Sequence, residues 1–263
     1  MPVKTALTTI VEGRVLLRGY DILSLMSKTS LAECACLLLT GEMPDRRTAR
    51  MMEAILVSCV DHGLNAPSAH IARATVSCGV PLASAVAAGL SAIGPHHGGA
   101  GEECARILQQ ALASHPSAEP ETLATGVVEE ALAAGRNLPG YGHRVHKGGD
   151  PRASFLLELA KEQGIYGRCC RLAEAIVPEL EQRKGARLPL NVDGAHAAIL
   201  SDMGFPWNRV QAAFLIGRCI GLCAQAMEER DKGSPLSFLK DAPVAEVYEG
   251  PDERPLPDGG GTA

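Results

Sequence analysis

Apolar residues recur with a helical spacing from about residue 21, and clusters of Pro, Gly, Asn and Asp interrupt them. Helices are therefore expected over most of the chain. The expected segments are 21–28, 30–39, 45–60, 68–77, 82–93, 102–114, 119–134, 153–163, 169–182, 190–199 and 207–230. Residues 8–20 instead carry β-branched side chains on either side of Glu12 and Gly13, which indicates a small hairpin. The pattern as a whole predicts an all-α fold.

Two features of this pattern concern packing. The segment 82–93 is rich in Ala and Ser, which predicts a helix enclosed by close neighbours at the centre of the molecule. Gly217 and Gly221 lie four residues apart in the last long helix, which predicts a tight crossing with another helix. No internal repeat and no long linker interrupts the chain, so separate domains joined by a flexible segment are not expected.

Composition agrees with this prediction. Of the 263 residues 46% are hydrophobic but only 3% are aromatic, which favours closely packed helices over a strand-rich core. The net charge of −5, with no basic stripe, argues against a nucleic-acid partner. No charge-free apolar stretch is long enough to cross a membrane, and the first residues do not resemble a secretory signal. We therefore expect a cytoplasmic location and no membrane partner.

The nine cysteines do not form a disulfide or zinc pattern. Their number is odd, and their spacings match no known zinc motif. Cys219 and Cys223 lie one helical turn apart, which would suit two ligands, but no second pair accompanies them. Free, buried thiols and no metal site are therefore expected.

Residues 139–152 contain two histidines, three basic residues and four glycines, and no hydrophobic period explains them. Glycine lets the backbone approach a ligand closely, histidine titrates near neutral pH, and arginine pairs with carboxylates or phosphates. The segment therefore predicts a site for a charged ligand. A single histidine in a loop would more often be solvated or structural.

Two further polar residues lie where helices are expected to begin. His97 precedes a helix, where the positive end of the helix dipole favours a neutral ring that can donate a hydrogen bond to a carbonyl. The alternative is that it only caps the helix, which suits the neighbouring His96 better. Asp193 stands at another helix start and is either an N-cap or a catalytic base. His196, one turn later, is expected to be structural.

Arg218 interrupts an otherwise apolar helix. A buried arginine needs a partner, and no acid lies within one helical turn. A ligand carboxylate and a salt bridge to a remote acid are both open as the partner.

In their order along the chain, several segments resemble the citrate synthase superfamily. They are residues 18–22, 37–44, 94–100, 139–145 with 150–152, 191–193 and 217–218. The resemblance covers nearly the whole chain. It implies a dimer with a citrate synthase-like fold, in which residues 1–98 and 185–263 form a large helical domain, 99–184 form a small helical domain, and the site lies in the cleft between them.

The resemblance also implies roles for individual residues. The implied catalytic residues are His97, His143 and Asp193, and the implied substrate-binding residues are His62, Arg152 and Arg218, with His143 also contacting the oxaloacetate part. Contacts with coenzyme A are implied for Arg144, Lys147, Lys184 and Arg187. No metal is implied, because the histidines can polarise the carbonyl. No permanently bound cofactor is implied either, since a coenzyme A thioester is itself the substrate or product.

The chain departs from typical citrate synthases in two ways. It is much shorter, and in this it resembles citryl-CoA lyase and the lyase module of ATP-citrate lyase. Where the family supplies an arginine from the partner subunit, residues 236–243 offer only Lys240, which lacks the bidentate fork.

The resemblance therefore implies cleavage of citryl-CoA to acetyl-CoA and oxaloacetate by a homodimer or higher homo-oligomer. Citrate synthase-type condensation and cleavage of a related acyl-CoA such as citramalyl-CoA are the alternatives. A catalytically silent coenzyme A-binding or scaffold protein would be expected to lack His97, His143 or Asp193, and all three are present.

Overall fold

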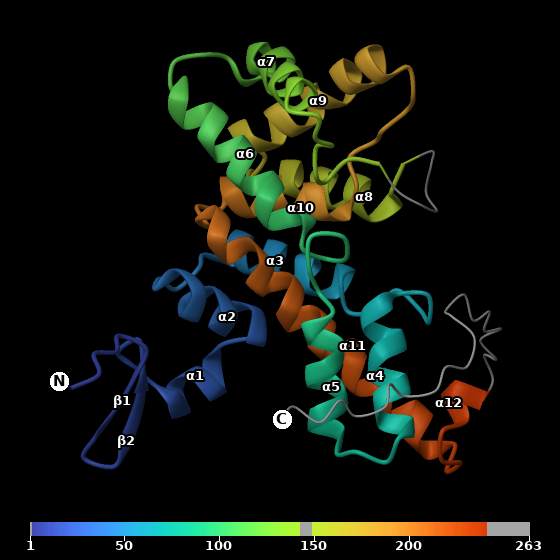
Figure 1. Ribbon diagram of the computed structural model, residues 1–263. Helices are drawn as coiled ribbons and strands as arrows, with labels where there is room; N and C mark the ends of the chain where they lie inside the picture. Colours follow the sequence, from blue (N-terminus) through green and yellow to red (C-terminus); the bar gives the residue numbers. More distant parts are fainter. Residues whose placement is uncertain (1, 143–148, 241–263) are drawn as a thin grey trace, which may run out of the picture.

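The computed structural model describes residues 2–142 and 149–240 and is mostly helical (Figure 1). The predictions for His143, Arg144 and Lys147, and for the side chain of Lys240, lie outside the described residues. The strands are β1 (Thr8–Val11), β2 (Arg14–Leu17) and β3 (Tyr20–Asp21). The helices are α1 (Ile22–Lys28), α2 (Leu31–Thr40), α3 (Arg46–Ser58), α4 (Pro67–Ser77), α5 (Leu82–Ser91), α6 (Ala100–Ser114), α7 (Pro120–Ala133), α8 (Pro151–Glu162), α9 (Arg168–Lys184), α10 (Val192–Asp202), η1 (Trp207–Arg209), α11 (Val210–Asp231) and α12 (Ser237–Lys240). The all-α prediction is confirmed.

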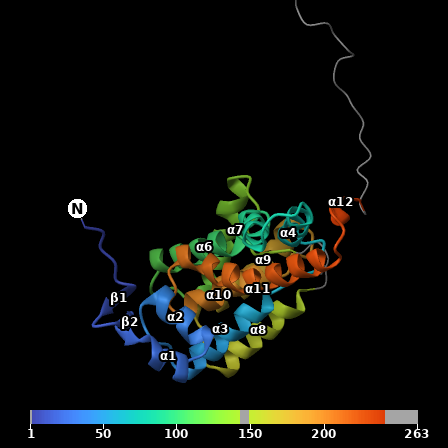
Figure 2. The ribbon, with the colours of Figure 1, turned by 90° about the horizontal axis from the view of Figure 1, so that it is seen from below.

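The expected hairpin is present at the N-terminus. Strands β1 and β2 pair in antiparallel fashion, and Glu12 and Gly13 between them have φ of 50° and 77°. A two-residue turn with both φ angles positive matches the twist of the strands it joins. The sequence did not predict β3, which adds two residues to the same sheet. Figures 1 and 2 both show the hairpin set apart from the helical body, beside α1.

Local polar residues define several helix ends as expected. Asp21 and Asp45 cap α1 and α3, and Ser30 forms a capping box with Glu33 at α2. Other boundaries differ from the prediction. Helix α4 begins at Pro67, because proline suits the first helical position, so Ser68 lies inside the first turn and does not start the helix.

The central helix is α10, not α5 as predicted. Every residue of 194–200 is buried, and α10 packs against α6, α8 and α9 (Figure 1). Helix α5 packs on α4 and α11, but Ala83, Ser84 and Ala87 on its other side are exposed within this chain. Small side chains permit close packing without requiring it on every face.

Helices α6–α10 share one continuous apolar core with residues of α2 and α3, including Met51, Leu108, Leu172 and Ile199. The division into a large domain of residues 1–98 and 185–263 and a small domain of residues 99–184 stays a prediction.

Helix α11 crosses the molecule and contacts α3, α4 and α5. Together with η1 it is the segment of the described residues that is long and apolar enough to cross a membrane, although Arg218 lies within it. Its apolar character is explained by its contacts with these helices. The predicted tight crossing is confirmed: a Cβ added at Gly217 would lie 2.5 Å from the carbonyl oxygen of Leu56, and one at Gly221 would lie 1.8 Å from that of Val60.

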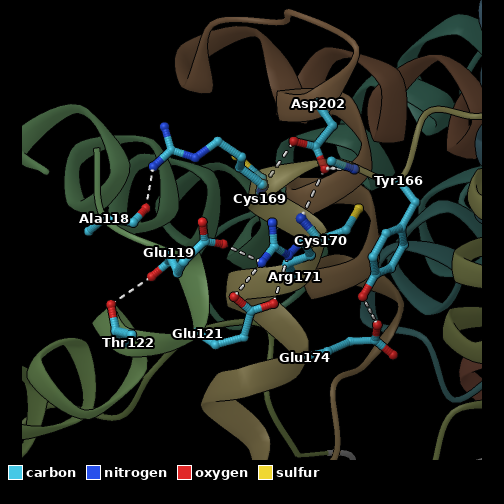
Figure 3. A network of polar contacts seen from close by, with 12 residues as sticks. Ala118, Glu119, Glu121, Thr122, Tyr166, Cys169, Cys170, Arg171, Glu174 and Asp202 are labelled. Carbon is cyan, nitrogen blue, oxygen red and sulfur yellow. Dashed lines mark hydrogen bonds and ion pairs between the residues drawn. The ribbon is translucent and has the colours of Figure 1, made fainter. Parts of the chain in front are cut away.

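The N-terminus of α9 is capped from another helix. Asp202, at the end of α10, accepts hydrogen bonds from the backbone N–H groups of Gly167, Cys169 and Cys170 at 2.8–2.9 Å (Figure 3). A carboxylate at this position satisfies amides that the helix leaves unpaired. Nearby, Arg171 joins α9 to Glu119 and Glu121 at the start of α7 (Figure 3). These bonds hold α7 and α9 in place around α10.

The crossing at Gly221 predicts a large effect of one methyl group. Gly221→Ala is expected to lower the free energy of unfolding by about 3 kcal/mol, because the new Cβ meets backbone that has to shift. Urea denaturation followed by circular dichroism measures this value. Gly126→Ala is the matched control, since Gly126 lies within α7 with open space around it. The control should raise stability by up to about 1 kcal/mol, and equal effects of the two substitutions would contradict the proposed crossing constraint.

Candidate active site

A tight turn positions His97 between α5 and α6. The backbone groups of Gly94 and His97 form two hydrogen bonds of 2.8 and 2.9 Å, and the N–H of Gly99 also bonds to Gly94. Gly98 has a φ of 70°, and a Cβ there would lie 2.4 Å from the Phe214 ring. The turn therefore requires glycine at this position. Gly99 precedes α6 without any side-chain cap, so His97 does not act as the helix cap.

The imidazole of His97 is held in one tautomer by Ser68. Its Nε2 accepts the backbone N–H of Ser68 at 3.2 Å and lies 2.8 Å from the Ser68 hydroxyl. A backbone N–H can only donate, so Nε2 carries the lone pair and Nδ1 carries the hydrogen. Burial lowers the pKa of His97, and the charges of Arg218 and His62 lower it further. The predicted neutral ring is thus supported, with Nδ1 as the available donor.

Arg218 is buried next to this histidine without an ion pair among the described residues. Its Nε donates to the carbonyl of Cys59 at 2.9 Å, and its Nη1 donates to the Ser68 hydroxyl at 3.1 Å. The guanidinium also lies 5.0 Å from the Phe214 ring centroid. Burial lowers the pKa of Arg218. No described residue forms the remote salt bridge considered from the sequence, which favours an anionic ligand as the partner of Arg218.

Asp193 lies in the first turn of α10, but it is not the N-cap. Asn191 caps the helix by accepting the N–H of Gly194 at 3.1 Å, so that alternative for Asp193 is wrong. The Asp193 carboxyl makes no hydrogen bond or ion pair within the described part of the chain. Burial raises its pKa to about 6, although Arg152 and Arg218 lower it. A carboxyl that titrates near neutral pH can both accept and donate a proton.

Arg152 is tied to the start of α10 through Asp150. The buried Asp150 carboxylate accepts two bonds from the Arg152 guanidinium, at 2.9 and 3.1 Å, and one from the backbone N–H of Val192 at 3.1 Å. Burial would raise the pKa of Asp150, but Arg152 holds it below its usual value. One carboxylate therefore fixes the positions of Arg152 and of the turn that carries Asp193.

The start of the histidine- and glycine-rich segment lies against the same turn. The N–H of Asn191 donates to Gly140, and the Asn191 side chain donates to the carbonyl of Gly142 at 2.8 Å. A Cβ at Gly140 would lie 2.8 Å from the Cα of Gly194, so the approach requires glycine. Two segments singled out in the sequence are thus neighbours in the fold.

His97 and Asp193 line one cavity of about 1280 Å³. It extends along α6 and α7 as far as Arg136 and Asn137. The predicted Lys184 lies beside it and donates to the Asn137 side chain at 2.6 Å. Arg187 does not line the cavity, and its Nε lies 3.7 Å from Glu181 Oε1. The elongated shape suits a long, flexible ligand whose reactive end lies at His97.

The two predicted substrate-binding arginines, Arg152 and Arg218, do not line this cavity. Arg152 instead lines a second cavity of about 510 Å³ between α3 and α8, and Arg218 is buried behind Ser68. His62, in the segment after α3, is exposed and acts electrostatically on His97. Within the described residues, no group of three or more His, Cys, Asp and Glu side chains could hold a metal ion.

Sequence reasoning missed two contributors to the site. Ser68 connects His97 with Arg218, but a serine in the first turn of a helix carries no signal that distinguishes it from a capping residue. Ser58 bonds to His196 at 2.7 Å and, through its carbonyl, to Arg152 at 3.4 Å. Burial lowers the pKa of His196 to about 3, consistent with the structural role expected for it.

Comparison with known proteins identifies the family. A family model described as "Citrate synthase, C-terminal domain" matches residues 44–237. The chain belongs to the citrate synthase family. It is 33% identical over 215 residues to "Putative citrate synthase 2" of Mycobacterium tuberculosis, which covers 80% of the chain and 54% of that relative. It is 29% identical over 245 residues to "Citrate synthase 2" of Bacillus subtilis, covering 90% of the chain and 60% of the relative. The chain thus spans little more than half the length of these curated family members.

Among solved structures, citryl-CoA lyase from Hydrogenobacter thermophilus is similar over its whole length. It is 40% identical with a TM-score of 0.87, and the match covers 96% of this chain and 97% of the lyase. ATP citrate lyase from Methanosaeta concilii, solved with (3S)-citryl-CoA, is 25% identical with a TM-score of 0.74, covering 95% of this chain and 42% of that one. The predicted resemblance of this family member to the short, lyase-type chains is confirmed.

The raised pKa of Asp193 predicts a pH-dependent cost to stability. Its folded pKa of about 6 exceeds the ordinary 3.8, so the folded state binds more protons and loses stability as pH rises between these values. Asp193→Asn should therefore be about 1–3 kcal/mol more stable than the parent protein at pH 8. The difference should fall to about 0.5 kcal/mol at pH 4 and vanish below about pH 3, where the carboxyl is protonated in both the folded and the unfolded state.

Urea denaturation at pH 4, 6 and 8 measures this difference. The exposed Asp231 provides the control, because Asp231→Asn should change stability by no more than about 0.5 kcal/mol at each pH. A destabilised Asp193→Asn variant at pH 8 would show that the ionised carboxylate has a stabilising partner.

Ser68→Ala removes the hydroxyl contact with His97 and keeps the backbone hydrogen bond. Loss of the hydroxyl leaves Arg218 Nη1 without its acceptor and should cost about 1–3 kcal/mol of stability. The tautomer of His97 should persist, because the backbone N–H of residue 68 still donates to Nε2. Long-range ¹H–¹⁵N NMR of the histidine rings detects the tautomer. Ser91→Ala, at an exposed helical serine, is the control for stability, and a changed tautomer in Ser68→Ala would rule out the backbone bond as its cause.

Proposed function

We propose that this member of the citrate synthase family is a citryl-CoA lyase, which cleaves citryl-CoA to acetyl-CoA and oxaloacetate. The proposal rests on one observation: His97 and Asp193 line the same cavity. His97 is neutral with its Nδ1–H available as a donor, and the pKa of Asp193 is raised. The full-length similarity to a citryl-CoA lyase supports the choice of substrate.

The reaction needs a base, an oxyanion donor and a proton donor. His143, assigned by the family resemblance, takes the proton of the tertiary hydroxyl. The bond between the carbinol carbon and the methylene carbon then breaks, so that the carbinol becomes the ketone of oxaloacetate and the electron pair passes to the thioester enolate. His97 Nδ1–H stabilises the enolate oxygen, and a proton from Asp193 converts the methylene carbon to the methyl group of acetyl-CoA. No water is consumed.

In this proposal Arg152 and Arg218 bind the carboxylates of the substrate. Arg218 has no acidic partner in the described chain, and Arg152 is fixed by Asp150, so both are pre-positioned cations. Each charge-assisted pair with a substrate carboxylate should contribute about 1.5–3 kcal/mol. The cavity along α6 and α7 would hold the coenzyme A part, with Lys184 at its edge.

Condensation of acetyl-CoA with oxaloacetate is the second candidate, favoured by the names of the curated relatives. The same groups can run the carbon–carbon step in either direction, and only hydrolysis of the thioester distinguishes a synthase.

One assay distinguishes these functions. Citryl-CoA is supplied, oxaloacetate is followed by NADH oxidation with malate dehydrogenase, and free coenzyme A is followed with a thiol reagent against an enzyme blank, because the protein has free cysteines. Oxaloacetate without free thiol is expected. Free thiol with citrate would favour the synthase, and neither product would reject both and direct the test to citramalyl-CoA.

His97→Ala tests the assignment of the oxyanion donor. The substitution should lower kcat by about 10²–10³-fold, because it removes a donor that stabilises charge in the transition state. His70, on α4, is exposed and lies outside the cavity lining, so His70→Ala should retain activity within a few-fold and serves as the control. Equal losses in the two variants would contradict the role of His97.

A further inference from the structure

Two cysteines of α11 lie outside both cavities and take no part in the proposed reaction. Cys219 and Cys223 are four residues apart in one helix, so their side chains lie on the same face, about 5–6 Å apart at Cβ. Both are free thiols. Their spacing lets both sulfur atoms bind one common group.

Their position makes them reachable from solvent. On the α11 surface they lie between a buried face that includes Arg218 and Leu222 and an exposed stripe that includes Ile220, which is 52% exposed. Each cysteine is itself partly exposed. Beneath them lies a small apolar cluster that includes Ala69 and Val86. The two sulfurs therefore stand at the edge of a packed surface, with one side open.

The chemistry of the pair favours a ligand that accepts neutral thiols. Burial raises the pKa of Cys219, and a hydrogen bond and charge interaction with Cys223 raise it further. Zinc requires thiolates and usually four ligands, and the described residues provide no such group. An organic arsenic(III) oxide instead condenses with two protonated thiols. Two As–S bonds form, the two S–H bonds and the arsenic–oxygen bonds break, and the oxygen leaves with both protons as water, without any oxidation or reduction.

We propose that Cys219 and Cys223 form a bidentate binding site for trivalent arsenicals. The other cysteines do not provide a second one. Cys34 and Cys36 are two residues apart and point to different sides of α2. Cys59, Cys104, Cys169 and Cys170 are buried and so are not reachable from solvent. Cys78 is exposed but has no adjacent cysteine.

Phenylarsine oxide added to the folded, reduced protein tests the site. Native mass spectrometry should show one phenylarsenic group per chain, with the loss of two titratable thiols. Cys223→Ser and Cys219→Ser should each weaken binding on the order of 10²–10⁴-fold, because the second As–S bond of a chelate forms intramolecularly. Cys78→Ser, at the exposed single cysteine, should bind as the parent protein does.

Three results would overturn the proposal: binding that survives in the Cys219→Ser, Cys223→Ser double variant, binding that consumes one thiol for each arsenic, and binding by the urea-unfolded chain but not by the folded chain. Thermal denaturation of each variant establishes that it is folded. The measurement needs no enzymatic activity, so its outcome does not depend on the proposed lyase function.

Discussion

The close approach of α11 to the end of α3 is the constraint on which the site depends. At Gly217 and Gly221 a helix lies against the backbone carbonyls of Leu56 and Val60 with no room for a Cβ. This contact allows Arg218, which lies between the two glycines, to reach the carbonyl of Cys59 and the hydroxyl of Ser68. A larger side chain at either glycine would move the guanidinium away from both acceptors.

From Arg218 a short chain of hydrogen bonds leads to His97. The guanidinium donates to Ser68, and Ser68 fixes the lone pair of His97. Among the described residues the cation is thus held by a carbonyl and a hydroxyl and not by a carboxylate, so its charge stays available to an anionic ligand. The same charge helps to keep His97 neutral. In the proposed reaction one buried cation would therefore both attract substrate and keep the oxyanion donor neutral.

Asp150 has the corresponding role on the other side of the site. It binds the Arg152 guanidinium and the backbone N–H of Val192, and so couples Arg152 to the turn that carries Asp193. Asp193 itself lacks such partners, which is why burial raises its pKa. Asp150 and Asp193 thus differ in pKa, because among the described residues the Asp150 carboxylate is hydrogen-bonded and the Asp193 carboxyl is not. This difference suits a reaction in which a carboxyl exchanges a proton.

The sequence by itself determined the helical fold, most helix ends and the family. These follow from local rules: the 3.6-residue period, capping by Asp21, Ser30 and Asp45, and the order of motifs that contain His97, Asp193 and Arg218. Tertiary packing decided which helix lies at the centre of the molecule. The Ala- and Ser-rich α5 has an exposed face within this chain, whereas α10 does not. The cap of α10 was a local ambiguity that the structure resolved in favour of Asn191 over Asp193. Tertiary structure decided that Ser68 joins His97 to Arg218. Such contacts connect residues up to 150 positions apart in the chain, and burial and hydrogen bonding over that separation leave no periodic signal in the sequence.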